Sequence, residues 1–294
     1  MVEENKGQWN KNLAYWFADG SIVLRVENIL YKIHISMLTK LSPDMGGILA
    51  IPDGKFDDDP TREGTEQFPL LLPGLSIQEF EDLLYWVYRV EWKALDDAEK
   101  ERVCTNLLKV SDLWQIEVGR AYAIDALQTI YLPPSRRLEL AGKYSIHHWV
   151  EGAVAEIFSG KLTDLSEDDL SRIGLKVYSI LVKGMHRMEI EMRRTANVEP
   201  AMTLDPDWQC KNHSVCIAAW KRLWWDRIGR KLLHPDSPIK TDAILAEVKK
   251  LTHKDLNDNC RKDMVREIET NVEFVDKRVI AGVGAAIITY NKNL

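Results

Sequence analysis

Three residues of the kinds that bind soft metal ions are evenly spaced along one short segment. Cys210, His213 and Cys216 lie three positions apart and follow an aperiodic loop at 195–207. Zinc prefers four thiolate or imidazole ligands in a tetrahedron, and such a loop lets the segment wrap an ion and supply three of them. Cys260, far downstream, is the candidate for the fourth ligand. These four residues therefore indicate a structural zinc site.

A second interpretation of the same residues needs no metal. Free cysteine is among the most buried residue types, so Cys210 and Cys216 can equally be small buried side chains at a helix N-terminus, with His213 exposed. On this interpretation the chain has no cofactor. The sequence alone favours this second interpretation, so no cofactor is expected, and a structural zinc ion is the alternative.

Composition limits the compartment and the partners. The chain has four cysteines and no secretory leader, so we expect reduced thiols and a cytoplasmic or nuclear protein. No apolar run of about 18 residues is present, which argues against a membrane span. The formal net charge is −6 and the pI is about 5.7. We expect no nucleic-acid partner, because phosphate binding needs a concentrated positive face.

Residues typical of catalysis do not form a recognisable constellation. The acidic runs at 57–59, 96–97 and 167–169 are typical of solvated loops and helix starts, whereas acid–base catalysis needs two acids in different environments. The sequence has no Gly-x-Ser-x-Gly, Walker or His-Glu-x-x-His motif, and nothing nominates a base for Cys104. We therefore expect no enzymatic activity. The alternative is a metal-dependent enzyme in the helical half, centred on the Cys/His cluster.

Two further features have structural explanations. His34 is expected to donate a hydrogen bond to a backbone carbonyl. Gly282-x-Gly284 has no preceding strand and no third glycine, so it indicates close helix packing and not a nucleotide loop.

Aromatic residues gather in the second half of the chain. A broad apolar face at helical spacing is formed by Ile217, Trp220, Leu223, Trp224, Trp225 and Ile228. Such a face can be a peptide-binding groove, because tryptophan anchors interfaces. It can also be a core, since a stripe this wide normally needs cover from neighbouring helices. We favour the core.

The first half of the chain combines strands with helices. Alternating apolar residues at 21–33, interrupted by Glu27-Asn28, predict a hairpin, and residues 68–72 predict a third strand at a sheet edge. Ser76 and Glu79 form a capping box that begins a helix. Further helices are expected near 98–113 and 116–130.

Pro133-Pro134 ends this pattern, and the remainder is helical. Helices are expected near 136–144, 146–158, 167–194, 213–233, 242–251, 256–270 and 276–290. The sequence thus predicts a polar N-terminal tail (1–12), an α+β domain (13–132) and an all-helical domain (133–294).

Several segments of the first half resemble, in their order, one known family. They are 19–26 (DGSIVLRV), 30–38 (LYKIHISML), 41–43 (LSP), 69–73 (PLLLP), 80–88 and 107–127. Together they resemble a BTB/POZ domain over about residues 13–130. The sequence is similar in character to those of fungal (basidiomycete-type) BTB proteins. Their second halves also resemble this one around Trp220, Trp224 and residues 232–235.

The resemblance implies a protein–protein interaction adaptor or scaffold. BTB domains commonly self-associate, and many carry substrates to cullin-type ubiquitin ligases. The extra apolar helix of dimer-forming members is not evident in the polar residues 1–12, although the resemblance still permits a homo-oligomer. The interaction surface is expected at Met45, Ile48, Ile51 and Asp53, where Ile51-Pro52-Asp53 stands in place of a hydrophobic-x-Glu motif. An assembly scaffold or transcriptional co-regulator without a ligase link is the alternative.

Overall fold

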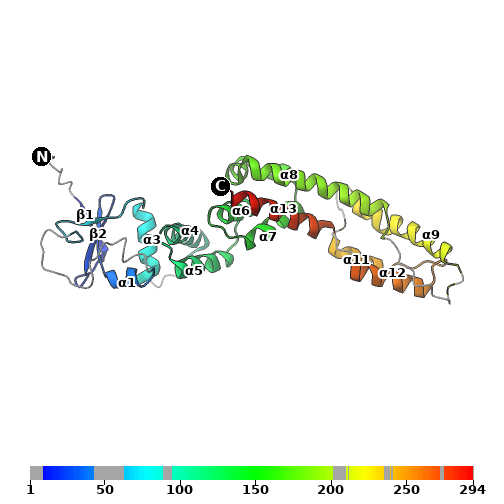
Figure 1. Ribbon diagram of the computed structural model, residues 1–294, viewed down its shortest axis with the longest axis horizontal. Coiled ribbons are helices and arrows are strands. Elements are labelled where there is room, and N and C mark those ends of the chain that lie inside the picture. Colours follow the sequence, from blue (N-terminus) through cyan, green and yellow to red (C-terminus); the bar gives the residue numbers. More distant parts are fainter. Residues whose placement is uncertain are drawn as a thin grey trace. The chain divides into compact units, whose positions relative to one another are not determined.

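The chain divides into two compact units, residues 1–132 and 133–294. The computed structural model describes residues 9–42, 63–88, 95–200, 210, 212–234, 239, 241–271 and 275–293. The strands belong to the N-terminal unit, and the C-terminal unit is helical over its described residues (Figure 1). The chain is therefore a mixed α+β protein. None of the described helices combines the length and apolar character that a bilayer crossing requires.

The described part of the N-terminal unit contains a four-stranded sheet in the order β1-β3-β2-β4. The strands are β1 (Asn10–Trp16), β2 (Ile22–Val26), β3 (Ile29–Ile33) and β4 (Leu70–Leu71). β2 and β3 form the predicted antiparallel hairpin, and Glu27 adopts the left-handed conformation (φ 51°) that its tight turn requires. β1 lies parallel to β3, and β4 lies parallel to β2.

One boundary in this unit differs from the sequence prediction. β1 begins at Asn10, inside the segment 1–12 that was expected to be a polar tail. Its polar residues gave no alternating pattern, because most of their side chains are exposed. The strand is held by its pairing with β3, from Asn10 opposite Ile29 onward. This pairing is a non-local contact that periodicity does not reveal.

Four helices of the N-terminal unit are described: α1 (Ile35–Thr39), α3 (Ile77–Tyr88), α4 (Asp97–Trp114) and α5 (Glu117–Gln128). Phe80, Leu83 and Leu84 on the apolar face of α3 are completely buried. The Phe80 ring packs edge-on against the buried ring of Tyr31, with the ring centroids 4.9 Å apart. The core of this unit thus lies between the hairpin and α3, with α4 packed beside α3.

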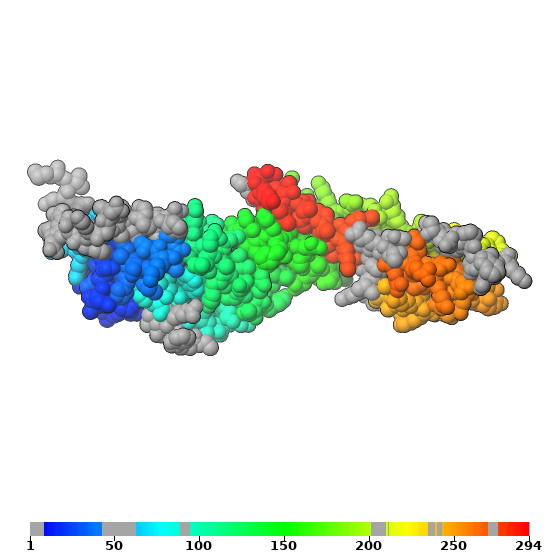
Figure 2. All heavy atoms as spheres, turned by 60° about the horizontal axis from the view of Figure 1, so that its bottom comes forward, coloured from blue at the N-terminus to red at the C-terminus, as the bar shows by residue number. Residues whose placement is uncertain are grey.

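Four helices of the C-terminal unit pack together: α6 (Pro134–Lys143), α7 (His148–Ser159), α8 (Glu167–Asn197) and α13 (Val275–Asn291), with the short 3-10 turn η1 (Leu162–Asp164) before α8. α6 starts on Pro134, since proline fits the first helical position. A capping box of Ser166 and Asp169 starts α8, which kinks at Gly174 (φ 74°). α13 lies against α7 and α8, as the red and green atoms of Figure 2 show.

The remaining helices form a smaller group, here called the α9–α12 lobe. It comprises α9 (His213–Leu223), the π-helical turn η2 (Trp224–Gly229), α10 (Arg230–Leu232), α11 (Thr241–Lys249) and α12 (Asp258–Asn271). Trp220 and Trp224 fill its core, with ring centroids 6.2 Å apart. The end of α8 contributes Ala196 to this core, and Trp224 Nε1 donates to the Thr195 carbonyl at 2.8 Å.

Candidate metal centre

Two helix N-termini in the α9–α12 lobe bring the cysteines and the histidine together. Cys210 precedes α9, His213 is the first residue of α9, and Cys216 lies one turn later. Cys260 is the third residue of α12. Residues three apart lie on the same face of a helix, so His213 and Cys216 point in similar directions. The packing of α12 in the same core supplies the distant cysteine.

The donor atoms lie within the range that one ion can span. The Sγ atoms of Cys210 and Cys216 are 3.6 Å apart, and Cys260 Sγ lies 3.6 Å from His213 Nδ1. The donors of Cys210, His213 and Cys260 all lie within 4.8 Å of one another. Among the described residues this is the one group of three or more His, Cys, Asp or Glu side chains arranged in this way.

The site is partly enclosed by the lobe core. Cys216 and Cys260 are 3% and 1% exposed, whereas Cys210 and His213 are half-buried. The interpretation with buried cysteines is therefore correct for Cys216, whereas Cys210 is only half-buried and His213 is not fully exposed. It does not explain why an imidazole and the third thiol of Cys260 also converge there.

Burial also affects the protonation of this cluster. Loss of solvent raises the pKa of the Cys260 thiol to about 12, and the neighbouring thiols of Cys210 and Cys216 contribute to the rise. A free Cys260 would hold its proton at neutral pH. A divalent cation reverses this preference, because a thiol that coordinates a metal is deprotonated outright.

The backbone adds one contact to the cluster that no sequence pattern signals. The Asn257 N–H donates to Cys216 Sγ at 3.4 Å, while the Asn257 side chain accepts from the Asn259 N–H at 2.9 Å and so caps α12. Asn257 therefore fixes the start of the helix that carries Cys260 and also contacts the cluster. The donor set of thiols and imidazole can hold a soft or borderline metal ion.

Other residues singled out in the sequence have different places. Met45, Ile48, Ile51 and Asp53 lie outside the described residues. The His34 ring contacts side chains and not a backbone carbonyl: its Nδ1 lies 3.2 Å from the Tyr88 hydroxyl, and its Nε2 lies 3.2 Å from Asp19. The hydrogen bond from His34 is the main cause of a lowered pKa at Asp19.

The aromatic face of the second half is a core, as favoured above. Trp220, Trp224 and Ile228 are buried. Ile217 and Trp225 are exposed by 42% and 39%, so their assignment to the same buried face was wrong.

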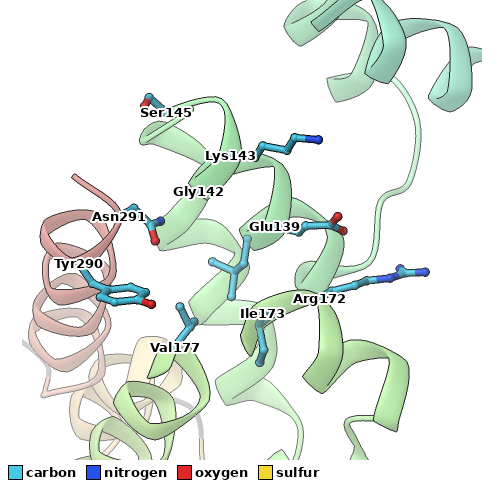
Figure 3. Close-up of a pocket in the computed structure, with 10 residues that line it drawn as sticks. Glu139, Gly142, Lys143, Ser145, Arg172, Ile173, Val177, Tyr290 and Asn291 are labelled. Carbon is cyan, nitrogen blue, oxygen red and sulfur yellow. The ribbon is translucent and has the colours of Figure 1, made fainter. Parts of the chain in front are cut away.

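A separate hollow of about 520 Å³ lies among α6, α8 and α13. Figure 3 shows Tyr290 and Asn291 on one side and Glu139 and Arg172 on the other. The Glu139 carboxylate accepts a hydrogen bond from Arg136 at 2.8 Å. The charged groups that line the hollow have both signs and do not form an acid–base pair aimed at one point. The hollow therefore does not indicate catalysis.

Comparisons of the chain with protein-family models, curated proteins and solved structures return no match. Its function must therefore be inferred from its own residues and geometry.

Proposed function

We propose that this chain is a protein-interaction adaptor whose N-terminal unit is a BTB/POZ-type domain. The observation that carries the proposal is the order and pairing of its elements. The antiparallel hairpin β2–β3 leads directly into α1, β4 then lies parallel to β2, and the capped helix α3 is followed by the pair α4 and α5. This is the order of the domains that the sequence resembles. Binding without covalent chemistry also agrees with described residues that offer no acid–base or nucleophilic constellation.

Within this proposal, the partner is a cullin-type ubiquitin ligase scaffold. The chain would then supply proximity and orientation, and catalysis would belong to the partner. The expected contact surface is formed by Met45, Ile48, Ile51 and Asp53. An assembly scaffold or transcriptional co-regulator without a ligase link is the competing role.

Light scattering on the full chain, alone and mixed with a cullin N-terminal domain, tests the ligase role. We expect the mass to increase by one cullin domain per chain. Ile48→Asp with Ile51→Asp should abolish the increase, because charges at an apolar contact cannot be desolvated cheaply. Leu175→Asp, at a residue of α8 that is 84% exposed, is the matched control and should leave binding intact. A wild-type chain that ignores the cullin domain would reject the ligase role, and a large homo-oligomer would favour the assembly scaffold.

We also propose that the Cys/His cluster holds zinc and that the ion is structural. The choice of zinc is supported by the thiolate and imidazole donors, the set typical of structural zinc sites. A metal-dependent enzyme in the helical half is less well supported, because the cluster contains no carboxylate that could act as a general base. Elemental analysis of the purified chain should give one zinc ion per molecule, and a fully folded, metal-free chain would remove both metal hypotheses.

A further inference from the structure

We infer that Cys210, His213, Cys216 and Cys260 are four ligands of one closed zinc site, and that this site is the clasp on which folding of the α9–α12 lobe depends. The inference rests on the proposed zinc. It adds that Cys216 closes the group formed by Cys210, His213 and Cys260, and it gives the ion a defined role in the fold.

The donor separations agree with the edges of a zinc tetrahedron. With zinc–sulfur bonds of about 2.3 Å and zinc–nitrogen bonds of about 2.0–2.1 Å, a tetrahedron has edges of about 3.8 Å between two sulfurs and about 3.6 Å between sulfur and nitrogen. The two separations of 3.6 Å, Cys210–Cys216 and His213–Cys260, match these lengths. They share no atom. Cys216 lies outside the group of donors that are all within 4.8 Å of one another, so binding of the ion must draw the two pairs together into opposite edges of one tetrahedron. Together they include all four side chains.

Two distant segments of the chain supply these ligands. Three come from a loop and the first turn of α9, and the fourth comes from the first turn of α12, 44 positions after Cys216. An ion bound here joins two helices, α9 and α12, that lie far apart in the sequence. Both helices present their N-termini to the site, and the partial positive charge of a helix N-terminus favours thiolates.

The surroundings of the ligands include a hydrogen-bond donor. Three thiolates and a divalent ion leave one net negative charge in a partly buried place, and such a charge needs hydrogen-bond donors. The Asn257 N–H supplies one at Cys216 Sγ. Four protein ligands leave no open coordination position, so the site is suited to holding structure and not to activating water.

The α9–α12 lobe is small. Its core consists of Ala196 and side chains between Cys216 and Ile268, in a lobe of roughly 60 residues, and units of that size bury limited apolar surface. Small domains often gain the missing stability from a metal or a disulfide. Cys216 and Cys260 belong to this same core, so an ion bound to them acts directly on its packing.

A disulfide accounts for fewer of these observations. A bond between Cys210 and Cys216 needs its sulfurs about 2.05 Å apart, well below the 3.6 Å separation. It would also leave the approach of His213 to Cys260 without a purpose.

Cobalt substitution in the full chain tests the number of ligands. After chelation, we expect one Co²⁺ per chain with the intense d–d bands of a tetrahedral ion and a charge-transfer band of three thiolates. Cys216→Ala should lower the charge-transfer band by about a third and weaken zinc binding more than about 100-fold, since even outer-shell changes cost 10–100-fold. His213→Cys keeps four ligands, so it should retain the ion and increase that band. Cys104→Ala removes a buried cysteine of the N-terminal unit and is the matched control.

These outcomes separate the inference from the proposal on which it rests. If the wild-type chain binds neither cobalt nor zinc, both the zinc proposal and the inference fall. If it binds cobalt but Cys216→Ala changes neither spectrum nor affinity, the zinc proposal stands and the four-ligand site is wrong.

Hydrogen exchange with and without zinc tests the clasp. Removal of the ion should abolish protection in α9 and α12 and leave α3 and α4 unchanged. His213→Cys with zinc should restore the protection that His213→Ala loses. Full protection of α9 and α12 in the chelated wild-type chain would overturn the clasp, whatever the ligand number.

Discussion

Glu79 has two roles at the start of α3. Its carboxylate accepts from the Ser76 N–H at 3.0 Å while its own N–H donates to Ser76 Oγ at 3.3 Å, which completes the capping box predicted from the sequence. The carboxylate also accepts from Lys109 Nζ of α4 at 2.5 Å. Burial raises the pKa of Glu79, but hydrogen bonding and the charge of Lys109, with the Ser76 contacts, outweigh it, so the pKa is lowered overall.

Glu79→Gln should therefore destabilise the N-terminal unit in a pH-dependent way. The folded-state pKa lies below the ordinary value of 4.5, so the carboxylate stabilises the fold fully above that pH and loses its contribution as pH falls through the folded-state pKa. We expect a cost of about 1 kcal/mol at pH 7 from urea unfolding, which shrinks on acidification. Lys109→Gln should show the same trend. If the difference in the free energy of unfolding between wild type and Glu79→Gln stays constant down to pH 3, this account is wrong.

The candidate site could be predicted only in part from its residues. Cys210, His213 and Cys216 were found because their spacing is local. Cys260 is a candidate in the sequence only as the remaining cysteine of the second half. Its approach to His213 depends on the packing of α12, which no spacing rule describes. The Asn257 N–H gave no signal at all, since every residue except proline has one.

At the scale of elements, Gly184 of α8 lies at a close contact with two neighbouring helices of the C-terminal unit. A Cβ atom there would lie 2.3 Å from Val283 Cγ2 of α13 and 3.0 Å from the Phe158 ring of α7. The sequence had assigned close packing to Gly282 and Gly284. That was wrong for Gly282, where a Cβ meets nothing within 4 Å.

Two substitutions of glycine by alanine should therefore have opposite effects. Gly184→Ala should cost about 1–3 kcal/mol in the free energy of unfolding, because an added methyl group overpacks the contact of α8 with α13. Gly282→Ala, in open space within α13, is the control and should be neutral or stabilising by up to about 1 kcal/mol, as alanine is the better helix former. Urea denaturation of both variants measures this, and equal effects would show that α8 and α13 are not in such close contact.

Most elements could be predicted because their signals are local. The hairpin, the capping box of α3 and the long helix after Ser166 were found from alternation, caps and helical spacing. The π-helical turn from Trp224 to Gly229 was missed inside a helix expected to be continuous. A Cβ on Gly229 would lie 2.5 Å from the Ala196 carbonyl oxygen, so this segment is shaped by its contact with α8, which the local sequence does not encode.

At the scale of the whole molecule, each unit has its own apolar core. The N-terminal core lies between the hairpin and α3. The C-terminal unit contains the packed helices α6, α7, α8 and α13 and the α9–α12 lobe. Alternating spacing at 21–33 and helical spacing in the later segments predict this mixed class, because each period belongs to one kind of element. The Pro133-Pro134 break predicts the boundary between the two units.

Calorimetry of the full chain should show separate responses of the two units. We expect Glu79→Gln to lower a transition of the N-terminal unit by about 3–5 °C, as a loss of about 1 kcal/mol implies for a unit of this size. Zinc chelation should lower only a transition of the C-terminal unit, because chains with several domains do not unfold in one step. A single transition moved by both treatments would show that the units unfold together.

The position of the α9–α12 lobe in the chain has a consequence for synthesis. α13 follows the lobe in sequence, yet it packs against α6, α7 and α8, which precede it. At about 5–20 residues per second, the ribosome needs several seconds to pass from α8 to α13. During that time α6, α7 and α8 lack their packing partner α13. Trp220 and Trp224 likewise lack the cover that α12, with Cys260, gives them in the folded lobe. The nascent chain therefore exposes apolar surface in two places at once, and it should depend on chaperones more than a chain of this length whose neighbouring helices pair in order of synthesis.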